Sequence, residues 1–144
     1  MSVLRSFAIS ASGMTAERLR MDTIANNLAN ANTTRTADGG PYRRQIPVFA
    51  AREAARPASG RRASAFTGMG VRVVGIAHDP GPPRLVYDPE HPDADENGYV
   101  HMPNVDVVRE MVDLISASRA YEANITSFNT AKAMAMRALD IGRA

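Results

Sequence analysis

The sequence has no cysteine and no tryptophan, and aromatic residues make up only 6% of its 144 positions. Without cysteine there is no disulfide framework, no thiolate nucleophile and no cysteine-based zinc site. Alanine and eight methionines supply much of the apolar volume, which suits narrow contacts between helices better than a broad core. A chain of this length forms one modest domain, and we expect its hydrophobic core to be thin.

Lysine is nearly absent as well. Lys132 is the only lysine among the 17 cationic residues; the others are arginines spread along the chain, and the net charge is only +2. A nucleic-acid-binding protein gathers its cations on one face or in a run, and this chain does neither. The composition therefore argues against a nucleic-acid partner, whereas arginine guanidinium groups suit bidentate pairing with carboxylates where protein surfaces meet.

Long apolar runs are also missing. No stretch of 18 apolar residues is present that could span a membrane. Serine and glycine interrupt the apolar residues near the N-terminus, and Glu17 follows them, so the segment lacks the continuous apolar region of a cleaved signal peptide. We expect no direct membrane insertion and no cleaved signal peptide.

Motifs for catalysis or for binding a metal or cofactor are absent or incomplete. Asp93-x-Asp95-x-Asn97-Gly98 matches the opening of an EF-hand calcium loop, but Asn104 stands where that loop needs a bidentate glutamate. The three histidines have no metal-ligand spacing, and no GxSxG nucleophile elbow is present. The sequence predicts no catalytic residues, no metal site and no cofactor.

Two long helical patterns lie at the ends of the chain. In the first, apolar residues recur in alternating steps of three and four, which predicts a helix over 3–31 with one apolar seam, interrupted at Arg18. Ser2 is a suitable N-cap, and the asparagines and threonines after Ala29 favour the end of the helix. The predicted members of this seam are Leu4, Phe7, Ala11, Met14, Met21 and Leu28.

The second pattern repeats the same steps, with interruptions at Ser118 and Lys132. Asn104 or Asp106 can cap its start, and Gly142 occupies the place of a glycine that ends a helix. A register sustained over this length requires a helical partner, so we expect residues 1–31 and 105–144 to pair as an antiparallel coiled coil. The predicted members of this seam are Val107, Met111, Leu114, Tyr121, Ile125, Phe128 and Leu139.

Residues 32–104 hold nearly all of the prolines and glycines and predict a middle region of short hairpins and loops. Asn97-Gly98 is the residue pair that a type I′ hairpin turn needs. Residues 50–66 show no usable period and predict a flexible loop. The fold class is thus mainly α with a small β region, and the predicted strands are 42–49, 70–77, 84–87 and 99–102.

Asparagines crowd the end of the first helix and recur in the second. Two interpretations stay open: they cap helix ends or face solvent, or they form a polar contact between subunits that fixes register, as a buried polar residue does in coiled coils. The residues concerned are Asn26, Asn27, Asn30, Asn32, Asn124 and Asn129.

Two segments resemble a known family. Residues 9–32, ISASGMTAERLRMDTIANNLANAN, resemble the N-terminal signature of bacterial flagellar rod, hook and related axial proteins. Residues 98–108, GYVHMPNVDVV, and residues 116–124, SASRAYEAN, are similar to the C-terminal half of proximal rod proteins of that family. The core of the first signature is Ala25, Asn26, Asn27, Leu28, Ala29 and Asn30.

The resemblance implies a structural subunit of the flagellar basal-body proximal rod, the drive shaft that crosses the periplasm and carries torque from the membrane ring to the hook. Another axial protein, a distal rod or hook-associated subunit, is the alternative. The implied partners are further copies of the chain, other rod subunits, a rod-to-membrane-ring adaptor protein and the flagellar type III export apparatus, which exports such proteins without signal cleavage. The family catalyses no reaction.

Two thin helices cannot bury every apolar face within one chain, so some apolar residues are candidates for contacts with neighbouring subunits. We expect Arg18 to pair with a carboxylate of a neighbour, and the terminal helices of a free monomer to fray until assembly orders them. The apolar candidates are Leu19, Ile24, Val108, Val112 and Ile115.

Overall fold

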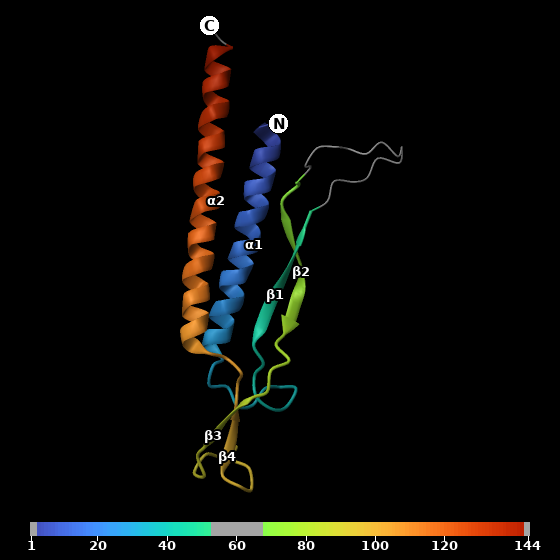
Figure 1. The fold of residues 1–144 in the computed structure, drawn as a ribbon, viewed down its shortest axis with the longest axis vertical. Coiled ribbons are helices and arrows are strands. Elements are labelled where there is room, and N and C mark those ends of the chain that lie inside the picture. The colour runs from blue at the N-terminus through green and yellow to red at the C-terminus, as the bar shows by residue number, and fades with distance from the viewer. Residues whose placement is uncertain (1–2, 53–67, 143–144) are drawn as a thin grey trace, which may run out of the picture.

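The computed structural model describes residues 3–52 and 68–142, and two long helices dominate it (Figure 1). Helix α1 lies between helix α2 and a two-stranded hairpin, and a second hairpin lies at the end of the molecule opposite both termini. The predicted fold class, mainly α with a small β region, is confirmed. The elements in order are α1 (Val3–Ala29), β1 (Gln45–Ala51), β2 (Val71–His78), β3 (Arg84–Tyr87), β4 (Tyr99–Met102) and α2 (Val107–Ile141).

The two helices run side by side in opposite directions (Figure 1). The rings of Phe7 and Phe128 lie 4.9 Å apart near the terminal end of the pair. At the other end Asn27 donates a hydrogen bond to Glu110. As residue numbers rise in α1, those of their partners in α2 fall, so one antiparallel register extends over most of α1. Neither of these described helices has a segment both long enough and apolar enough to cross a membrane.

Capping interactions account for the ends of both helices. Helix α1 ends at Ala29, two residues before the predicted end, and the side chain of Asn30 donates to the main-chain oxygen of Asn26 at 3.0 Å. Asp106 caps α2 as predicted, because its carboxylate accepts from the backbone N–H groups of Val108 and Arg109. Gly142 caps the other end with φ −78°, in the right-handed region, so it does not adopt the left-handed geometry that a helix-ending glycine usually supplies.

Strands β1 and β2 pair antiparallel, from Gln45 opposite His78 to Ala51 opposite Val71, with a bulge after Val48. The predicted strand 42–49 starts too early. Residues 50 and 51, predicted as loop, still pair with β2, because β2 continues opposite them. The remainder of the predicted flexible loop, apart from residue 52, lies outside the described residues.

Strands β3 and β4 also pair antiparallel, and both have the bounds that the sequence predicts. The predicted type I′ turn at Asn97-Gly98 is wrong. Such a turn needs positive φ at both central residues, but no described residue other than glycine has positive φ, so only Gly98 (φ 78°) meets that condition. Instead, the backbone N–H of Gly98 donates to the carbonyl of Asp95 at 3.0 Å, which closes a turn at the end of a longer connection.

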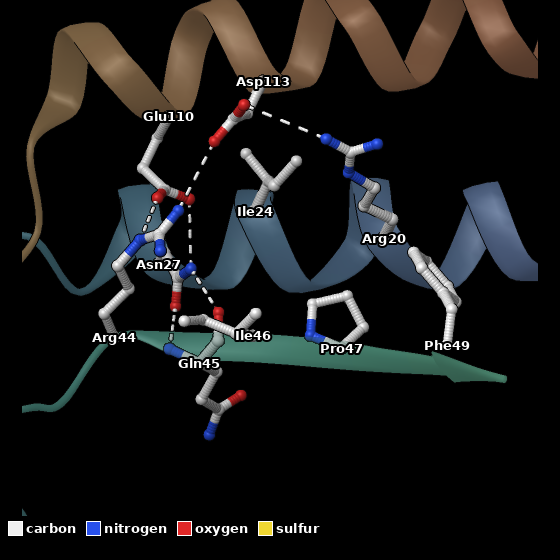
Figure 2. A pocket seen from close by; sticks show the side chains of 10 residues that line it. All are labelled: Arg20, Ile24, Asn27, Arg44, Gln45, Ile46, Pro47, Phe49, Glu110 and Asp113. Atoms are coloured by element: carbon white, nitrogen blue, oxygen red, sulfur yellow. Dashed lines mark hydrogen bonds and ion pairs between the residues drawn. The ribbon is translucent and has the colours of Figure 1, made fainter. Parts of the chain in front are cut away.

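The hydrophobic core of the described residues is small and is spread over both helices, β4 and the connecting segments. Ile24 is buried where α1, β1 and the start of α2 meet, in the same pocket lining as Ile46 and Asp113 (Figure 2). Its prediction as a contact with neighbouring subunits is therefore wrong. The buried apolar residues are Ala16, Ile24, Ala31, Val100, Val105 and Ala117.

Candidate functional site

The predicted seam residues divide into two groups. Eight are half-buried: Phe7, Met14, Met21 and Leu28 on α1, and Leu114, Tyr121, Ile125 and Phe128 on α2. Five are exposed, so no described part of the chain covers them: Leu4, Ala11, Val107, Met111 and Leu139.

The start of α2 explains part of this division. Glu110 is completely buried, whereas Met111, the predicted seam residue beside it, is 53% exposed. A row with the same alternating steps begins at Glu110 and continues through Leu114, Ala117 and Tyr121. The inner face of α2 thus begins on a polar residue, one position away from the apolar row that the sequence suggests.

Glu110 belongs to a polar cluster at the base of the helix pair, which we term the base junction: Asn27, Tyr42, Arg44, Gln45, Glu110 and Asp113. Figure 2 shows these side chains with the exception of Tyr42. Asn27 is 1% exposed. Its amide nitrogen donates to the carbonyl of Gln45 at 2.9 Å and to Glu110 Oε2 at 3.0 Å. Its amide oxygen accepts from the Gln45 N–H and the Tyr42 hydroxyl, both at 2.9 Å. One side chain thereby joins α1, β1 and α2, with all of its hydrogen-bonding capacity used.

Arg44 balances the buried carboxylate. Its Nε lies 2.5 Å from Glu110 Oε1, and its Nη2 lies 3.4 Å from Asp113 Oδ2 (Figure 2). A third carboxylate, that of Asp79, lies 3.8 Å from Nη1. A buried ion pair adds little net stability against an apolar replacement, but removing one partner is costly because the other charge stays buried. The base junction therefore holds its elements in one arrangement.

The main chain of Arg44 fixes the connections around the base junction. Its N–H donates to Asn104 Oδ1, and its carbonyl accepts from the N–H of Asp79, at 2.9 and 2.8 Å. The amide nitrogen of Asn104 donates in turn to the carbonyl of Gly81 at 3.2 Å. The loops before β1 and before α2 are thus tied to each other as well as to the helices.

Replacing Tyr42 by phenylalanine tests one hydrogen bond of the base junction. Burial, and then the negative charge of Glu110, raise the pKa of Tyr42 above its ordinary value near 10. The folded chain therefore resists ionisation of Tyr42, so its stability falls as the pH rises from about 10 towards that higher pKa. Tyr42→Phe is expected to lower the free energy of unfolding at neutral pH by about 1 kcal/mol and to flatten this alkaline loss.

Urea unfolding at several pH values measures both effects. Tyr87→Phe is the control, since Tyr87 is 65% exposed, and it should leave both quantities unchanged. If the stability of Tyr42→Phe fell as steeply above pH 10 as that of the parent chain, the alkaline loss could not be assigned to Tyr42.

The asparagines fit neither interpretation as a group. Asn27 fixes register, but within one chain rather than between subunits. Asn30 does serve at a helix end, and Asn26 is exposed while donating to the Tyr42 hydroxyl at 3.1 Å. Asn124 donates to the carbonyl of Ala120 in its own helix, where a β-carbon on Gly13 of α1 would come within 2.8 Å of its amide oxygen. The helices therefore approach closely at Gly13.

The acidic segment 93–98, whose sequence matches the first half of an EF-hand calcium loop, forms hydrogen bonds within the chain. Asp93 accepts hydrogen bonds from the Thr34 hydroxyl and from Arg35. The Thr34 bond, followed by the charge of Arg35, holds the pKa of Asp93 below its usual range. Asp95 accepts from the backbone N–H groups of Asn97 and Tyr99. Within residues 3–52 and 68–142, no group of three acidic or histidine side chains is placed to hold a metal ion.

A pocket of about 330 Å³ lies beside the base junction (Figure 2). Ile24, Ile46, Pro47 and Phe49 are its apolar lining, and Arg20 lies one turn before Ile24 on α1, 3.8 Å from Asp113. The two carboxylates in its lining, Glu110 and Asp113, both contact arginine side chains. The charged side chains of this pocket connect α1, α2 and the start of β1.

Helix α2 carries a second feature on its outer side. Val108, Met111, Val112 and Ile115 are all more than half exposed. They lie within two turns, so they form a continuous apolar surface next to the base junction. Exposed apolar patches of this kind mark contacts with other proteins.

Comparisons with known proteins identify relatives along the whole chain. Residues 7–35 match the family described as flagella basal body rod protein, and residues 96–141 match the family described as flagellar basal body rod FlgEFG protein C-terminal. The flagellar basal-body rod protein FlgC of Borreliella burgdorferi is 49% identical, over 98% of each chain. The proteins of that name from Bacillus subtilis and Salmonella typhimurium are each 43% identical, over 99% of this chain and all of theirs.

Proposed function

The chain belongs to the FlgC family of flagellar basal-body rod proteins, and from this membership we propose how its two helices build the rod. It is a structural subunit of the flagellar basal body, in a family that is not a family of enzymes. Its copies assemble helically with other subunits of the proximal rod, and the resulting shaft carries torque from the membrane ring to the hook.

Helices α1 and α2 act in this assembly as an antiparallel coiled coil. Their opposite directions, the continuous register and the eight half-buried seam residues support this pairing. The base junction sets the register at one end, as buried polar residues do in coiled coils. A pair of helices locked in this way presents its outer faces in a fixed relation to neighbouring subunits.

The observation that carries the assembly proposal is the apolar surface on the outer side of α2. Val108, Val112 and Ile115 are 71%, 61% and 58% exposed, and no described residue of the chain covers them. The other exposed seam residues are further uncovered positions on both helices: Leu4 and Ala11 on α1, and Val107, Met111 and Leu139 on α2. The half-buried Leu19 and the exposed Arg18 remain candidates for neighbour contacts.

Other rod subunits are the partners of these surfaces, and a rod-to-membrane-ring adaptor protein joins the shaft to the membrane. The chain reaches its place through the flagellar type III export apparatus without signal cleavage. The terminal helices of the exported monomer fray from their free ends and become ordered on assembly, because these ends of an isolated helix pair retain too little buried area to offset their conformational entropy. The second candidate is another axial subunit, of the distal rod or of the hook junction.

The test is deletion of the gene, with export and motility scored and purified basal bodies imaged by electron microscopy. We expect rings without a rod in the deleted strain, and a complete rod after complementation. A rod that stops at its distal part would favour the second candidate. Intact rods and normal motility in the deleted strain would refute a structural role in the shaft.

A further inference from the structure

A groove opens on the side of α1 that faces away from α2. It has a volume of about 660 Å³ and lies between α1 and β2. Its α1 side consists of small residues on successive turns, Ala8, Ala11 and Thr15, followed by Leu19. Small side chains leave room for another helix to approach closely. We call this feature the α1–β2 groove.

The hairpin supplies the other wall. Val71 and Val73 are apolar and half-buried, whereas Arg52 and Arg72 are exposed. No acidic residue lines the α1–β2 groove. Its complement is therefore a surface with a row of larger apolar side chains and at least one carboxylate.

Helix α2 carries such a surface. Val108, Met111 and Ile115 are exposed at steps of three and four, and the exposed Glu122 follows after two further turns. We call these four residues the outer row. At 3.6 residues per turn Glu122 lies within about 10° of the mean direction of the outer row, whereas Arg119 lies about 50° to one side.

We propose that the outer row of one copy docks in the α1–β2 groove of a second copy, an inference that rests on the proposed role as a rod subunit. The apolar side chains of the outer row fill the space over Ala8, Ala11 and Thr15, and Glu122 pairs with Arg52 or Arg72. This contact places α2 of one copy beside α1 of the next.

The positions of the two surfaces agree with this arrangement. Within one molecule α1 lies between α2 and β2, so the outer row and the α1–β2 groove are on different sides of it (Figure 1). A contact between unlike surfaces leaves one copy of each surface free at the ends of every pair. Such head-to-tail contacts continue into rings or helical arrays instead of closing as dimers.

The absence of cysteine from the chain makes a cross-linking test direct. Ala11→Cys and Ile115→Cys, combined in one chain, are expected to give disulfide-linked dimers and larger oligomers of the chain when purified basal bodies are oxidised. The control combines Ala11→Cys with Ser116→Cys, an exposed position next to Ile115 that points away from the outer row. The control should give no such dimer.

Charge exchange provides a second measurement. Glu122→Arg and Arg72→Glu are each expected to reduce the amount of the chain in basal bodies, and the chain carrying both substitutions should recover it. A cross-link to a different rod protein, a control dimer as abundant as that of the tested pair, or no recovery by charge exchange would overturn the proposal. If rods form normally without this chain, the proposed function itself fails, which is a distinguishable result.

Discussion

Glu110→Ala is expected to lower the free energy of unfolding by about 3–5 kcal/mol, the cost of removing one partner of a buried ion pair. Glu110 is fully buried, and its loss leaves Arg44 beside an empty space and the amide nitrogen of Asn27 with one acceptor fewer. Domains of this size have a total stability of about 5–15 kcal/mol, so the variant should be largely unfolded in moderate urea. Urea titration followed by circular dichroism measures the effect.

The matched control is Glu122→Ala, on the same helix but exposed, which should change the stability of the isolated chain by less than about 0.5 kcal/mol. A chain carrying both Glu110→Leu and Arg44→Met should be more stable than the chain with Glu110→Ala, because neither member of the buried pair is then left alone. Asp79 and Asp113, which also contact Arg44, are 30% and 33% exposed, so water can solvate them. Equal stability of the Glu110→Ala and Glu122→Ala chains would show that the base junction does not hold the fold together.

Gly70→Ala is expected to lower the free energy of unfolding by roughly 2–5 kcal/mol, from two separate causes. Gly70 has φ +96°, a conformation that side chains other than glycine rarely adopt. A β-carbon there would also lie 2.1 Å from the Ser12 hydroxyl oxygen, which accepts a hydrogen bond from the N–H of Val71. The substitution therefore strains the backbone and separates the hairpin from α1.

Gly40→Ala separates these causes. Gly40 has a similar φ of +79°, but nothing lies within 4 Å of the position that its β-carbon would take. Gly40→Ala should therefore lower the free energy of unfolding by the backbone strain alone, about 1–2 kcal/mol. The excess loss in Gly70→Ala measures the close contact with Ser12. If both substitutions cost the same, the hairpin does not pack against α1 as closely as the distances indicate.

Much of the fold could be predicted from the sequence, because its signals are local. Steps of three and four located both helices, and turn residues bounded β3 and β4 correctly. The helix seam was harder to predict, because two rows on α2 share Leu114, Tyr121 and Phe128. One row starts at Val107 and includes Met111, and the other starts at Glu110. Hydrophobicity favours Met111, whereas the structure buries Glu110.

The base junction could not be predicted from such patterns. Arg44 and Glu110 are 66 residues apart in the sequence, and each belongs to a type that is usually exposed. Their pairing depends on where β1 starts, and the sequence placed that start three residues too early. Asn27 stood out in sequence as part of an asparagine-rich segment, but its partners lie in two distant parts of the chain: Tyr42 and Gln45 at the start of the hairpin, and Glu110 on α2. Only the three-dimensional arrangement brings them together.

Helix α2 is longer than the helix that supports it. Phe7 of α1 lies against Phe128, so the start of α1 at Val3 corresponds to a position near residue 132, and α2 continues to Ile141. About nine residues, roughly 13 Å of helix, therefore extend past α1. Their backbone amide hydrogens should exchange with deuterium within seconds in the free chain, while those around Glu110 stay protected for much longer. Slow exchange over the same nine residues in assembled rods would show that a neighbour completes the helix pair.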